Sequence, residues 1–207
     1  QKVYDKALKF ESYVAHPTHK MSLGRYTDDT QMSIGVAEVL IQGPPFTPIV
    51  FANAFVERFQ RDQRLGYSAN FQKFLVGVKT GQEFLDQIRH SSAHLLAAAV
   101  LELYPDTKLT IGPAIENGFY YDFDFASPIS ETDLTLIEDK MRELLPNWKS
   151  FSHREVSEQE AREFYKDNPY KLELIDEIIK KGEKITFYKA GDPSANSGQD
   201  FEDLCRG

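Results

Sequence analysis

The 207-residue sequence predicts an α+β fold, in which an all-helical amino-terminal part precedes a part that combines helices with antiparallel strands. Residues 88–103 are apolar at nearly every helical position after residue 94, which predicts a long helix buried in a domain interior. Residues 119–125 alternate aromatic side chains with tyrosine or aspartate, as a half-buried strand does. Helical and strand patterns then alternate as far as residue 189, so we expect the buried helix to pack against an antiparallel sheet.

The first predicted helix follows Ser33, and its apolar residues at helical spacing are Ile34, Val36, Ala37, Val39 and Leu40. Thr27, Asp28 and Asp29 stand just before it. Two carboxylates beside a threonine hydroxyl offer the hard oxygen ligands that Mg²⁺ or Ca²⁺ requires. The same residues are also typical of a helix start, where they cap the backbone and interact favourably with the helix dipole. The residues alone leave both interpretations open.

Short blocks spread over residues 13–67 are shared with one family; they are Tyr13-Val14, His16-Pro17, His19-Lys20, Tyr26 to Met32, Phe51-Ala52, Ala54-Phe55-Val56, Arg61-Asp62, Arg64 and Gly66-Tyr67. On these blocks residues 1–85 resemble the ADP-ribosylglycohydrolase family. The resemblance implies an all-helical fold and a site for two Mg²⁺ ions, with Thr27, Asp28 and Asp29 among the ligands. The family's other ligand segments are absent from this sequence. We therefore expect an incomplete magnesium site and no glycohydrolase activity.

His90 and His94 lie four residues apart within the predicted buried helix, so both rings project from one face. Two imidazoles in a mostly dry environment can activate water, bind a carbonyl group or ligate a metal. The zinc-protease signature has the same spacing but needs a glutamate directly after the first histidine, and here that residue is Ser91. The alternative is that both histidines only make hydrogen bonds within a core.

A hairpin follows the helix. Thr107–Ile111 is a predicted strand that ends at Gly112-Pro113, and Asn117-Gly118 supplies the two turn residues of a hairpin. Phe119–Phe125 is the returning strand. The later elements are predicted from their periodicity, caps and breakers; they are a helix from Ser130 to Leu145, a strand from Phe151 to Val156, a helix opened by the capping box Ser157–Glu160, a helix from Pro169, a strand from Lys184 to Lys189, and a loop from Gly191 to Gly198.

Five ordered blocks carry a second resemblance; they are Ile88 to His94, Thr110 to Pro113, Glu116 to Asp122, Pro169 to Lys171, and Asp203 to Gly207. On these blocks residues 86–207 resemble the editing domain that threonyl-tRNA synthetase shares with alanyl-tRNA synthetase. The resemblance implies hydrolysis of mischarged seryl-tRNA, with the aminoacylated 3′ end of a tRNA as the partner. We expect the two parts to meet near Leu85-Asp86, with no flexible linker between them.

The same resemblance implies a set of site residues. The catalytic candidates are His90, His94, Lys171, Asp203 and Cys205, and the substrate-binding candidates are Tyr120 and Tyr121. Editing of the threonyl type implies no cofactor. Two histidines and a thiolate form an incomplete zinc site of the kind that alanyl relatives fill. We expect no zinc here.

Composition limits the classes of partner. The net charge of −8 argues against general affinity for nucleic acid, because proteins that hold phosphate backbones unaided usually present a basic face. A single cysteine excludes an internal disulfide and suits a reducing cytoplasm. No segment is apolar enough for a membrane span and no signal peptide opens the sequence. We expect a cytoplasmic protein without membrane or DNA partners; the oligomeric state is left open.

The ends of the sequence also lead to an expectation. It begins with Gln1 and stops at Gly207, where the editing family continues with Pro-His. We expect a fragment truncated at its carboxy end, without the ligation core and with impaired editing. The leading hypothesis is an editing esterase of the aminoacyl-tRNA synthetase family. The alternatives are a Mg²⁺-dependent ADP-ribosyl hydrolase fragment and a non-catalytic module that binds a nucleotide end.

Overall fold

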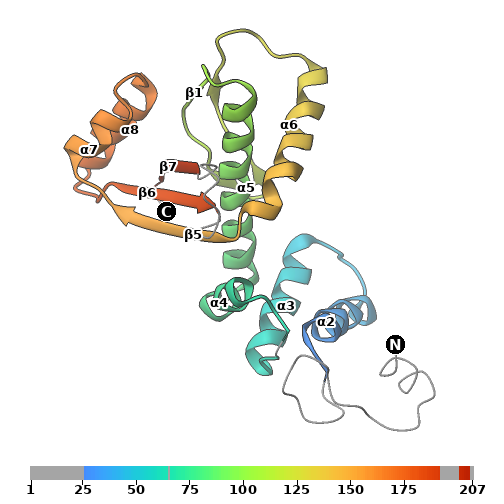
Figure 1. Cartoon of the computed structure of the whole chain (residues 1–207). Coiled ribbons are helices and arrows are strands. Elements are labelled where there is room, and N and C mark those ends of the chain that lie inside the picture. The colour runs from blue at the N-terminus through green and yellow to red at the C-terminus, as the bar shows by residue number, and fades with distance from the viewer. Residues whose placement is uncertain (1–25, 65, 192–200, 206–207) are drawn as a thin grey trace, which may run out of the picture. The chain divides into compact units, whose positions relative to one another are not determined.

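The computed structural model of the chain describes residues 26–64, 66–191 and 201–205. The chain divides into two compact units, Gln1–Leu85 and Asp86–Gly207. The described residues form seven α-helices and three small antiparallel sheets, which confirms the α+β class (Figure 1). The sequence blocks at 13–25, most of the predicted loop 191–198, and residues 206–207 lie outside the described residues.

The first unit is helical throughout its regular described elements, which are α2 (Asp28–Gln42), α3 (Pro48–Arg61) and α4 (Ala69–Gly77). Pro48 occupies the first position of α3, where its missing N–H removes no helical hydrogen bond. Ser68 caps α4 by accepting a hydrogen bond from the backbone N–H of Phe71. Apolar side chains of this unit pack into one core, whose buried members are Ala52, Val56, Phe59, Leu75, Val78 and Phe84.

The long helix α5 (Gly81–Leu103) carries the paired histidines, and the boundary between the two units falls within it. Its second half is buried on most faces, as its apolar sequence predicts; the buried residues are Ala93, His94, Leu95, Ala97, Ala98, Ala99 and Val100. Alanine at several of these positions allows neighbouring elements to approach the helix closely. The helix ends two residues before Pro105, which cannot continue it.

Two short antiparallel pairs follow α5. The pairs are β1 (Lys108–Leu109) with β4 (Phe123–Asp124), and β2 (Ala114–Ile115) with β3 (Gly118–Phe119). The predicted single strand from Phe119 to Phe125 is therefore wrong in its continuity. Pro113 has no N–H to donate to a ladder, so between the two pairs only isolated hydrogen bonds remain. One joins the Asp122 N–H to the Ile111 carbonyl at 2.9 Å.

The hairpin turn also lies one residue earlier than the sequence predicts. Ile115 is paired with Gly118, so the two turn residues are Glu116 and Asn117 rather than Asn117 and Gly118. Gly118 begins β3 with a φ of +159°, a value at the edge of the range that glycine adopts more readily than other residues.

A three-stranded antiparallel sheet organises the rest of the second unit. Its strands run in the order β5 (Ser150–Glu155), β6 (Thr186–Gly191) and β7 (Phe201–Cys205), so β7 is an edge strand. β6 begins two residues later than predicted. The helices are α6 (Glu131–Leu144), followed by a 3₁₀ turn at Leu145–Asn147, α7 (Glu158–Phe164) and α8 (Pro169–Lys180).

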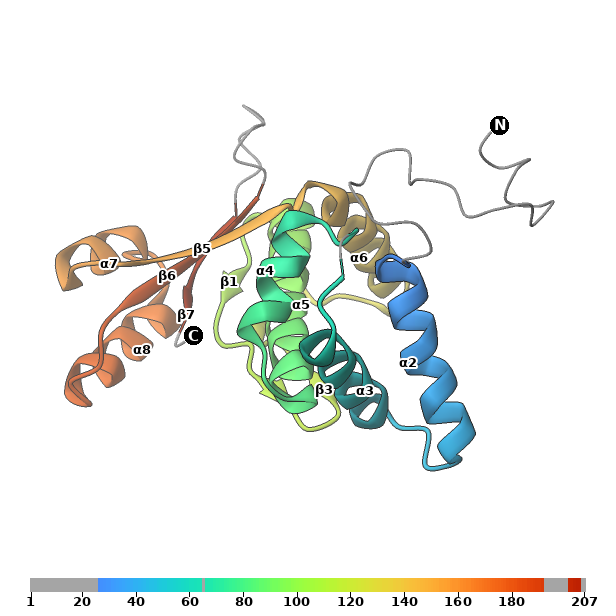
Figure 2. The same ribbon diagram turned by 90° about the horizontal axis from the view of Figure 1, so that it is seen from below.

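The helices of the second unit lie in two groups along the sheet. In Figures 1 and 2, α7 and α8 lie toward one end of the strands, and α5 and α6 lie toward the other end. Each group has its own core. Phe187 and Leu204 pack with α7 and α8, whereas Ala190 and Phe201, at the opposite end of the strand pair, pack with α5 and α6.

Helix caps hold the site-bearing helices in place. The Asn168 side chain accepts a hydrogen bond from the Lys171 backbone N–H at 3.2 Å, and its amide nitrogen donates to the Leu109 carbonyl at 2.8 Å. One side chain therefore ties the start of α8 to β1. Ser157 accepts from the Glu160 N–H as predicted, but the Glu160 carboxylate pairs with Arg154 at 2.5 Å, and no return bond to the Ser157 backbone is seen.

Candidate active site

A half-closed cavity of about 360 Å³ lies in the second unit. It is lined by residues of α5, the segment after β1, α8 and β7, together with Tyr121; they are His90, His94, Thr110, Ile111, Gly112, Pro113, Ala114, Tyr121, Lys171, Leu174, Ile178, Asp203, Leu204 and Cys205. All five catalytic candidates from the sequence line this cavity. Segments separated by more than a hundred residues in the chain thus contribute to one site.

The two histidines and the cysteine form a chain of contacts. His90 Nε2 lies 3.2 Å from His94 Nε2 and 2.9 Å from Cys205 Sγ. The His94 ring stacks on Tyr188 with an interplanar angle of 5°, and the His90 ring meets the same tyrosine edge-on. Tyr188 therefore fixes both imidazole planes, although it does not itself line the cavity.

Asp203 is the centre of the polar contacts behind the histidines. Its Oδ1 lies 2.6 Å from Lys171 Nζ and accepts a hydrogen bond from Tyr165 Oη at 3.1 Å. Its Oδ2 accepts from Tyr121 Oη at 2.6 Å and lies 3.5 Å from His94 Nδ1. That last distance is at the limit of a hydrogen bond, and His94 Nδ1 makes none within standard geometry.

Burial and charge set the ionisation of the site. Burial would raise the pKa of Asp203, but the positive charge of Lys171 and the proximity of His94 outweigh it and hold the pKa at about 2. Burial lowers the pKa of His90 to about 4, with a further contribution from His94, against the opposing effect of Asp203. At neutral pH the site therefore holds an ionised Asp203 and an uncharged His90.

The two tyrosines on Asp203 stay protonated. Burial, followed by the negative charge of Asp203, raises the pKa of Tyr121 and of Tyr165 well above the ordinary value of 10. Lys171 Nζ also lies 3.2 Å from Tyr121 Oη, so the lysine, Tyr121 and Asp203 form a closed triangle. Tyr120, the other predicted substrate-binding residue, is 44% exposed and is not among the lining residues.

Sequence reasoning missed Tyr165 and Tyr188. The strand predicted at 184–189 contains Tyr188, but its alternation shows only that one face is buried, not which residue it faces. Tyr165 is the residue directly after α7, and nothing in its local sequence indicates a contact with Asp203.

One metal-binding arrangement occurs within the described part of the chain. The ligand atoms of His90, His94 and Cys205 all lie within 4.8 Å of one another. Imidazole and thiolate suit Zn²⁺, and a structural zinc site would need a fourth ligand. Among the described residues no fourth histidine, cysteine or carboxylate belongs to this group. The three residues fit an open zinc site chemically, so the expectation of no zinc stays a prediction.

The predicted magnesium ligands lie at the start of α2. Thr27 is its N-cap residue without a side-chain capping bond, and Asp28 and Asp29 stand in the first turn. Gly66 approaches Asp28 so closely that a Cβ there would lie 2.0 Å from a carboxylate oxygen. The described residues bring no third carboxylate, histidine or cysteine to these two aspartates. This donor set does not fit a closed magnesium site.

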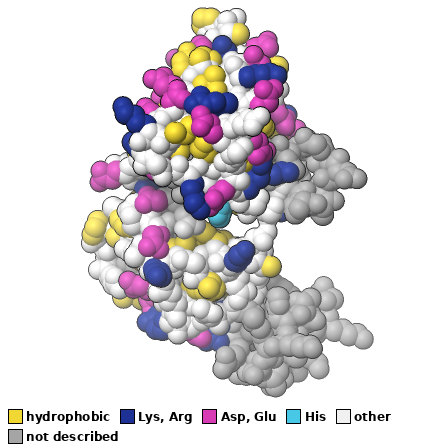
Figure 3. Space-filling view, turned by 90° about the vertical axis from the view of Figure 1, so that its left-hand side faces the viewer, with side chains coloured by type: hydrophobic (Ala, Val, Ile, Leu, Met, Phe, Trp, Pro, Cys, Tyr) yellow, Lys and Arg dark blue, Asp and Glu magenta, His cyan; other side chains and the backbone are white. Residues whose placement is uncertain are grey.

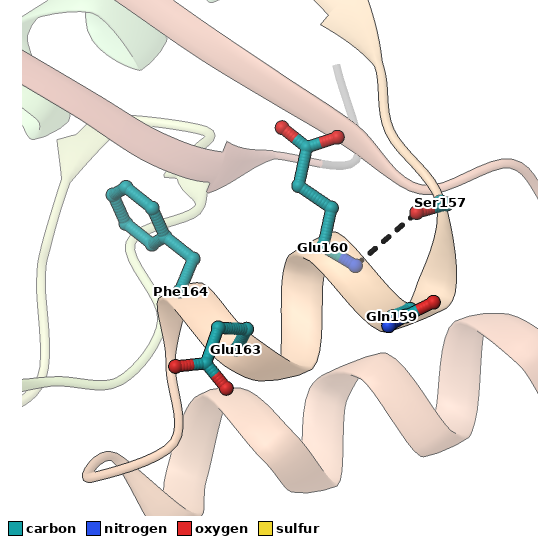
Figure 4. Close-up of a pocket in the computed structure, with 5 residues that line it drawn as sticks. All are labelled: Ser157, Gln159, Glu160, Glu163 and Phe164. Carbon is teal, nitrogen blue, oxygen red and sulfur yellow. Dashed lines mark hydrogen bonds between the residues drawn. The ribbon is translucent and has the colours of Figure 1, made fainter.

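A second hollow, of about 460 Å³, lies over α7 (Figure 4). Its lining residues are all exposed: Ser157, Gln159, Glu160, Glu163 and Phe164. It has two carboxylates and no buried polar group, so it offers no counterpart to the Asp203 cluster. On the molecular face in Figure 3, Lys and Arg side chains are interspersed with Asp and Glu and form no continuous basic field.

Within the described ranges, no helix combines the length and apolar character needed to cross a membrane.

Comparisons with known proteins give a consistent picture. No family model matches the sequence. The chain is 52% identical over 125 residues to a protein named threonine--tRNA ligase from Rubrobacter xylanophilus, covering 60% of this chain and 18% of that protein. It is 45% identical over 126 residues to the protein of that name from Borrelia turicatae, covering 61% of this chain and 20% of the relative.

A third relative extends the similarity. The threonine--tRNA ligase from Francisella tularensis is 43% identical over 156 residues, covering 74% of this chain and 23% of its own length. This alignment is longer than the second unit, so it reaches into the first. None of these relatives bears the name of an ADP-ribosylglycohydrolase, and that resemblance of residues 1–85 stays a prediction. Over 60–74% of its length the chain is thus similar to threonine--tRNA ligases, of which it spans less than a quarter.

Proposed function

We propose that this chain carries the editing site of a threonine--tRNA ligase, which hydrolyses the ester between serine and the 3′ end of a mischarged tRNA. One observation carries the proposal: His90, His94, Lys171, Asp203 and Cys205 line one half-closed cavity. An ionised carboxylate, an uncharged imidazole and a buried ammonium group are the groups that ester hydrolysis needs.

Hydrolysis of seryl-tRNA corrects errors that arise because a binding pocket discriminates poorly between serine and threonine. Serine lacks one methyl group of threonine, and a binding pocket discriminates such a difference by only about 1–3 kcal/mol. A threonine ligase therefore needs a second site, which hydrolyses serine from the tRNA after serine has been attached by mistake. Part of the cavity lining is apolar, including Ile111, Leu174 and Ile178, against which an aminoacylated ribose can lie.

His94 is the proposed general base. The Asp203 carboxylate lies beside His94 Nδ1, so it favours the tautomer with a proton on Nδ1 and stabilises the imidazolium ion that proton uptake creates. His94 Nε2 then accepts a proton from water as the water oxygen attacks the ester carbonyl carbon. His90, whose pKa burial lowers to about 4, stays uncharged at neutral pH and positions the water.

The remaining steps use groups already in place. Lys171, which lines the cavity with its ammonium held by Asp203, stabilises the developing oxyanion. The carbon–oxygen bond to the ribose breaks, and the proton on His94 passes to the departing ribose oxygen. The products are serine and a tRNA with a free terminal hydroxyl. No step requires a metal.

The partner is the aminoacylated end of a tRNA. A chain of net charge −8 with interspersed surface charges is poorly suited to hold a whole tRNA by itself. We infer that other parts of a ligase grip the tRNA and carry out ligation, in the cytoplasm, while this site receives only the 3′ end.

The test is deacylation of seryl-tRNA and threonyl-tRNA by the full chain. We expect serine release to exceed threonine release, and we expect His94→Ala to lower the rate about 10²–10⁴-fold. His153→Ala is the matched control, because His153 lies exposed on β5 and does not line the cavity. Binding of seryl-tRNA without hydrolysis would instead favour a binding module, and equal release of both amino acids would contradict editing.

A further inference from the structure

Tyr165 makes two hydrogen bonds with one hydroxyl group. It donates to Asp203 Oδ1 at 3.1 Å and accepts from the backbone N–H of Leu204 at 2.7 Å. The two partners are consecutive residues of β7, and Cys205 follows them. Tyr165 is itself buried, with 7% of its surface exposed, and it does not line the cavity.

The bond to Leu204 has a structural cause. β7 is the edge strand of its sheet, and the Leu204 N–H is turned toward Tyr165. A buried N–H without a partner is destabilising, so the hydroxyl oxygen takes the place of a carbonyl oxygen from a neighbouring strand. The bond from Tyr165 to Asp203 uses the remaining hydroxyl proton.

The Asp203 carboxylate has four neighbours that set its orientation. Oδ1 faces Lys171 and Tyr165, and Oδ2 faces Tyr121 and His94. Three of these neighbours, Lys171, Tyr121 and His94, line the cavity. Tyr165 is the neighbour that does not line the cavity, and its ring packs against Phe164 and Phe187.

We propose that Tyr165 is a positioning residue, which fixes the Asp203 carboxylate and the adjoining end of β7 and thereby orients His94 and Cys205 in the cavity. It acts on the reaction only through Asp203, and this inference rests on the proposed hydrolysis. No substrate atom is expected to touch it. Its loss should therefore lower kcat and leave KM nearly unchanged.

The experiment compares Tyr165→Phe with Tyr104→Phe in the full chain. Phenylalanine keeps the ring packing of Tyr165 and removes only its hydroxyl. Tyr104→Phe is the matched control, because Tyr104 Oη donates to the Asp133 carboxylate at 2.8 Å and neither residue lines the cavity. For seryl-tRNA hydrolysis, we expect Tyr165→Phe to lower kcat about 10–100-fold, the range found when hydrogen-bond partners of metal-binding residues are removed. A raised KM at unchanged kcat would overturn the assignment.

A second readout does not depend on activity. The ¹⁵N resonance of His94 Nδ1 reports the approach of the carboxylate, so it should shift in Tyr165→Phe and stay in place in Tyr104→Phe. If no chain hydrolyses seryl-tRNA, the proposed function fails, and this resonance alone decides whether Tyr165 positions Asp203. If Tyr165→Phe does not fold, Tyr165→meta-fluorotyrosine is the second variant. Its hydroxyl keeps the hydrogen bonds to Asp203 and Leu204 and is a stronger donor to Asp203. An unchanged His94 resonance would then overturn the inference.

Discussion

Lys171 Nζ lies 2.6 Å from Asp203 Oδ1, with the lysine side chain 2% exposed and the aspartate side chain 1% exposed. Such a pair is held by its own attraction and by the hydroxyls of Tyr121 and Tyr165 around the carboxylate. Either partner alone would be a buried charge without compensation, which is far less stable than the pair.

Asp203→Asn should therefore destabilise the second unit strongly. We expect the free energy of unfolding to fall by about 3–5 kcal/mol, because Lys171 would be left buried without a counter-charge. Chemical denaturation measures the change. Asp124→Asn is the control: Asp124 is exposed and accepts one hydrogen bond from Tyr170, so its loss should cost less than about 1 kcal/mol. Equal effects of the two variants would contradict the pairing.

Acid should destabilise the second unit between about pH 6.5 and pH 4. The pKa of His90 falls from 6.5 to about 4 on folding, so in this range the unfolded chain binds more protons than the folded chain. Stability then decreases as the pH is lowered. Asp203, with a pKa of about 2 instead of 3.8, adds a loss of the same sign at still lower pH. Denaturation midpoints measured across this range check the slope.

The variant that isolates this effect is His90→Gln, which should flatten the slope between pH 6.5 and pH 4. His153→Gln serves as its control because His153 is exposed on β5. A slope that survives His90→Gln would assign the acid sensitivity to other groups.

Gly112→Ala should disturb the cavity wall. A Cβ at Gly112 would lie 2.1 Å from Cδ2 of the Tyr121 ring, so the ring must move and carry its hydroxyl away from Asp203. We expect a loss of about 1–3 kcal/mol in unfolding free energy and a lower rate of deacylation. Gly77→Ala in α4 meets no atom within 4 Å, so it should leave the rate unchanged and should not lower the unfolding free energy. A wild-type rate in Gly112→Ala would show that the ring position is not critical.

Metal chelation should leave deacylation unchanged. Of the described residues only His90, His94 and Cys205 form a candidate zinc group, and the proposed mechanism uses the two histidines without a metal. Treatment with a strong chelator, followed by elemental analysis and a rate measurement, makes the comparison. A rate that falls with chelation and returns with Zn²⁺ would replace the metal-free mechanism.

Asp28 and Asp29 should not bind Mg²⁺ tightly. The described residues supply no further carboxylate to them, so the ion would keep most of its water ligands. Titration calorimetry of the full chain with MgCl₂ should show no binding in the micromolar range. Micromolar binding that Asp28→Ala removes would restore the magnesium-site hypothesis.

Periodicity predicted α2, α5, α6 and α8, because burial of a helical face leaves a regular pattern in the sequence, whereas α3 and α4 were not predicted individually. The burial of α5 and the Ser130 cap of α6 follow from such local signals. The turn at Glu116-Asn117 was missed because a one-residue register shift depends on pairing across the hairpin, not on the dipeptide alone. The break between β3 and β4 likewise follows from Pro113, which lies on the opposite strand of the hairpin.

The catalytic candidates were predicted from a family resemblance, whereas the contacts between them could be seen only in the structure. Spacing placed His90 and His94 on one face, but the 2.9 Å approach of Cys205 joins residues 115 positions apart. Tyr165 had no distinguishing local pattern, because a tyrosine after a helix is ordinary in sequence. Its role depends on the position of β7 at the edge of the sheet, and the order of strands in a sheet cannot be predicted from the sequence of one strand.

Asn168 is subject to two chemical requirements at once. Its oxygen must accept from the Lys171 N–H, and its nitrogen must donate to the Leu109 carbonyl. Aspartate offers only acceptors when ionised, and the short serine hydroxyl cannot serve two partners that lie in different directions. Of the residues that commonly cap helices, only asparagine carries both functions on so short a side chain. Asn168 thus connects the helix that carries Lys171 to the strand β1 that precedes the cavity-lining segment, and of the common capping residues only asparagine makes both bonds. Neither Asn168 nor Leu109 lines the cavity.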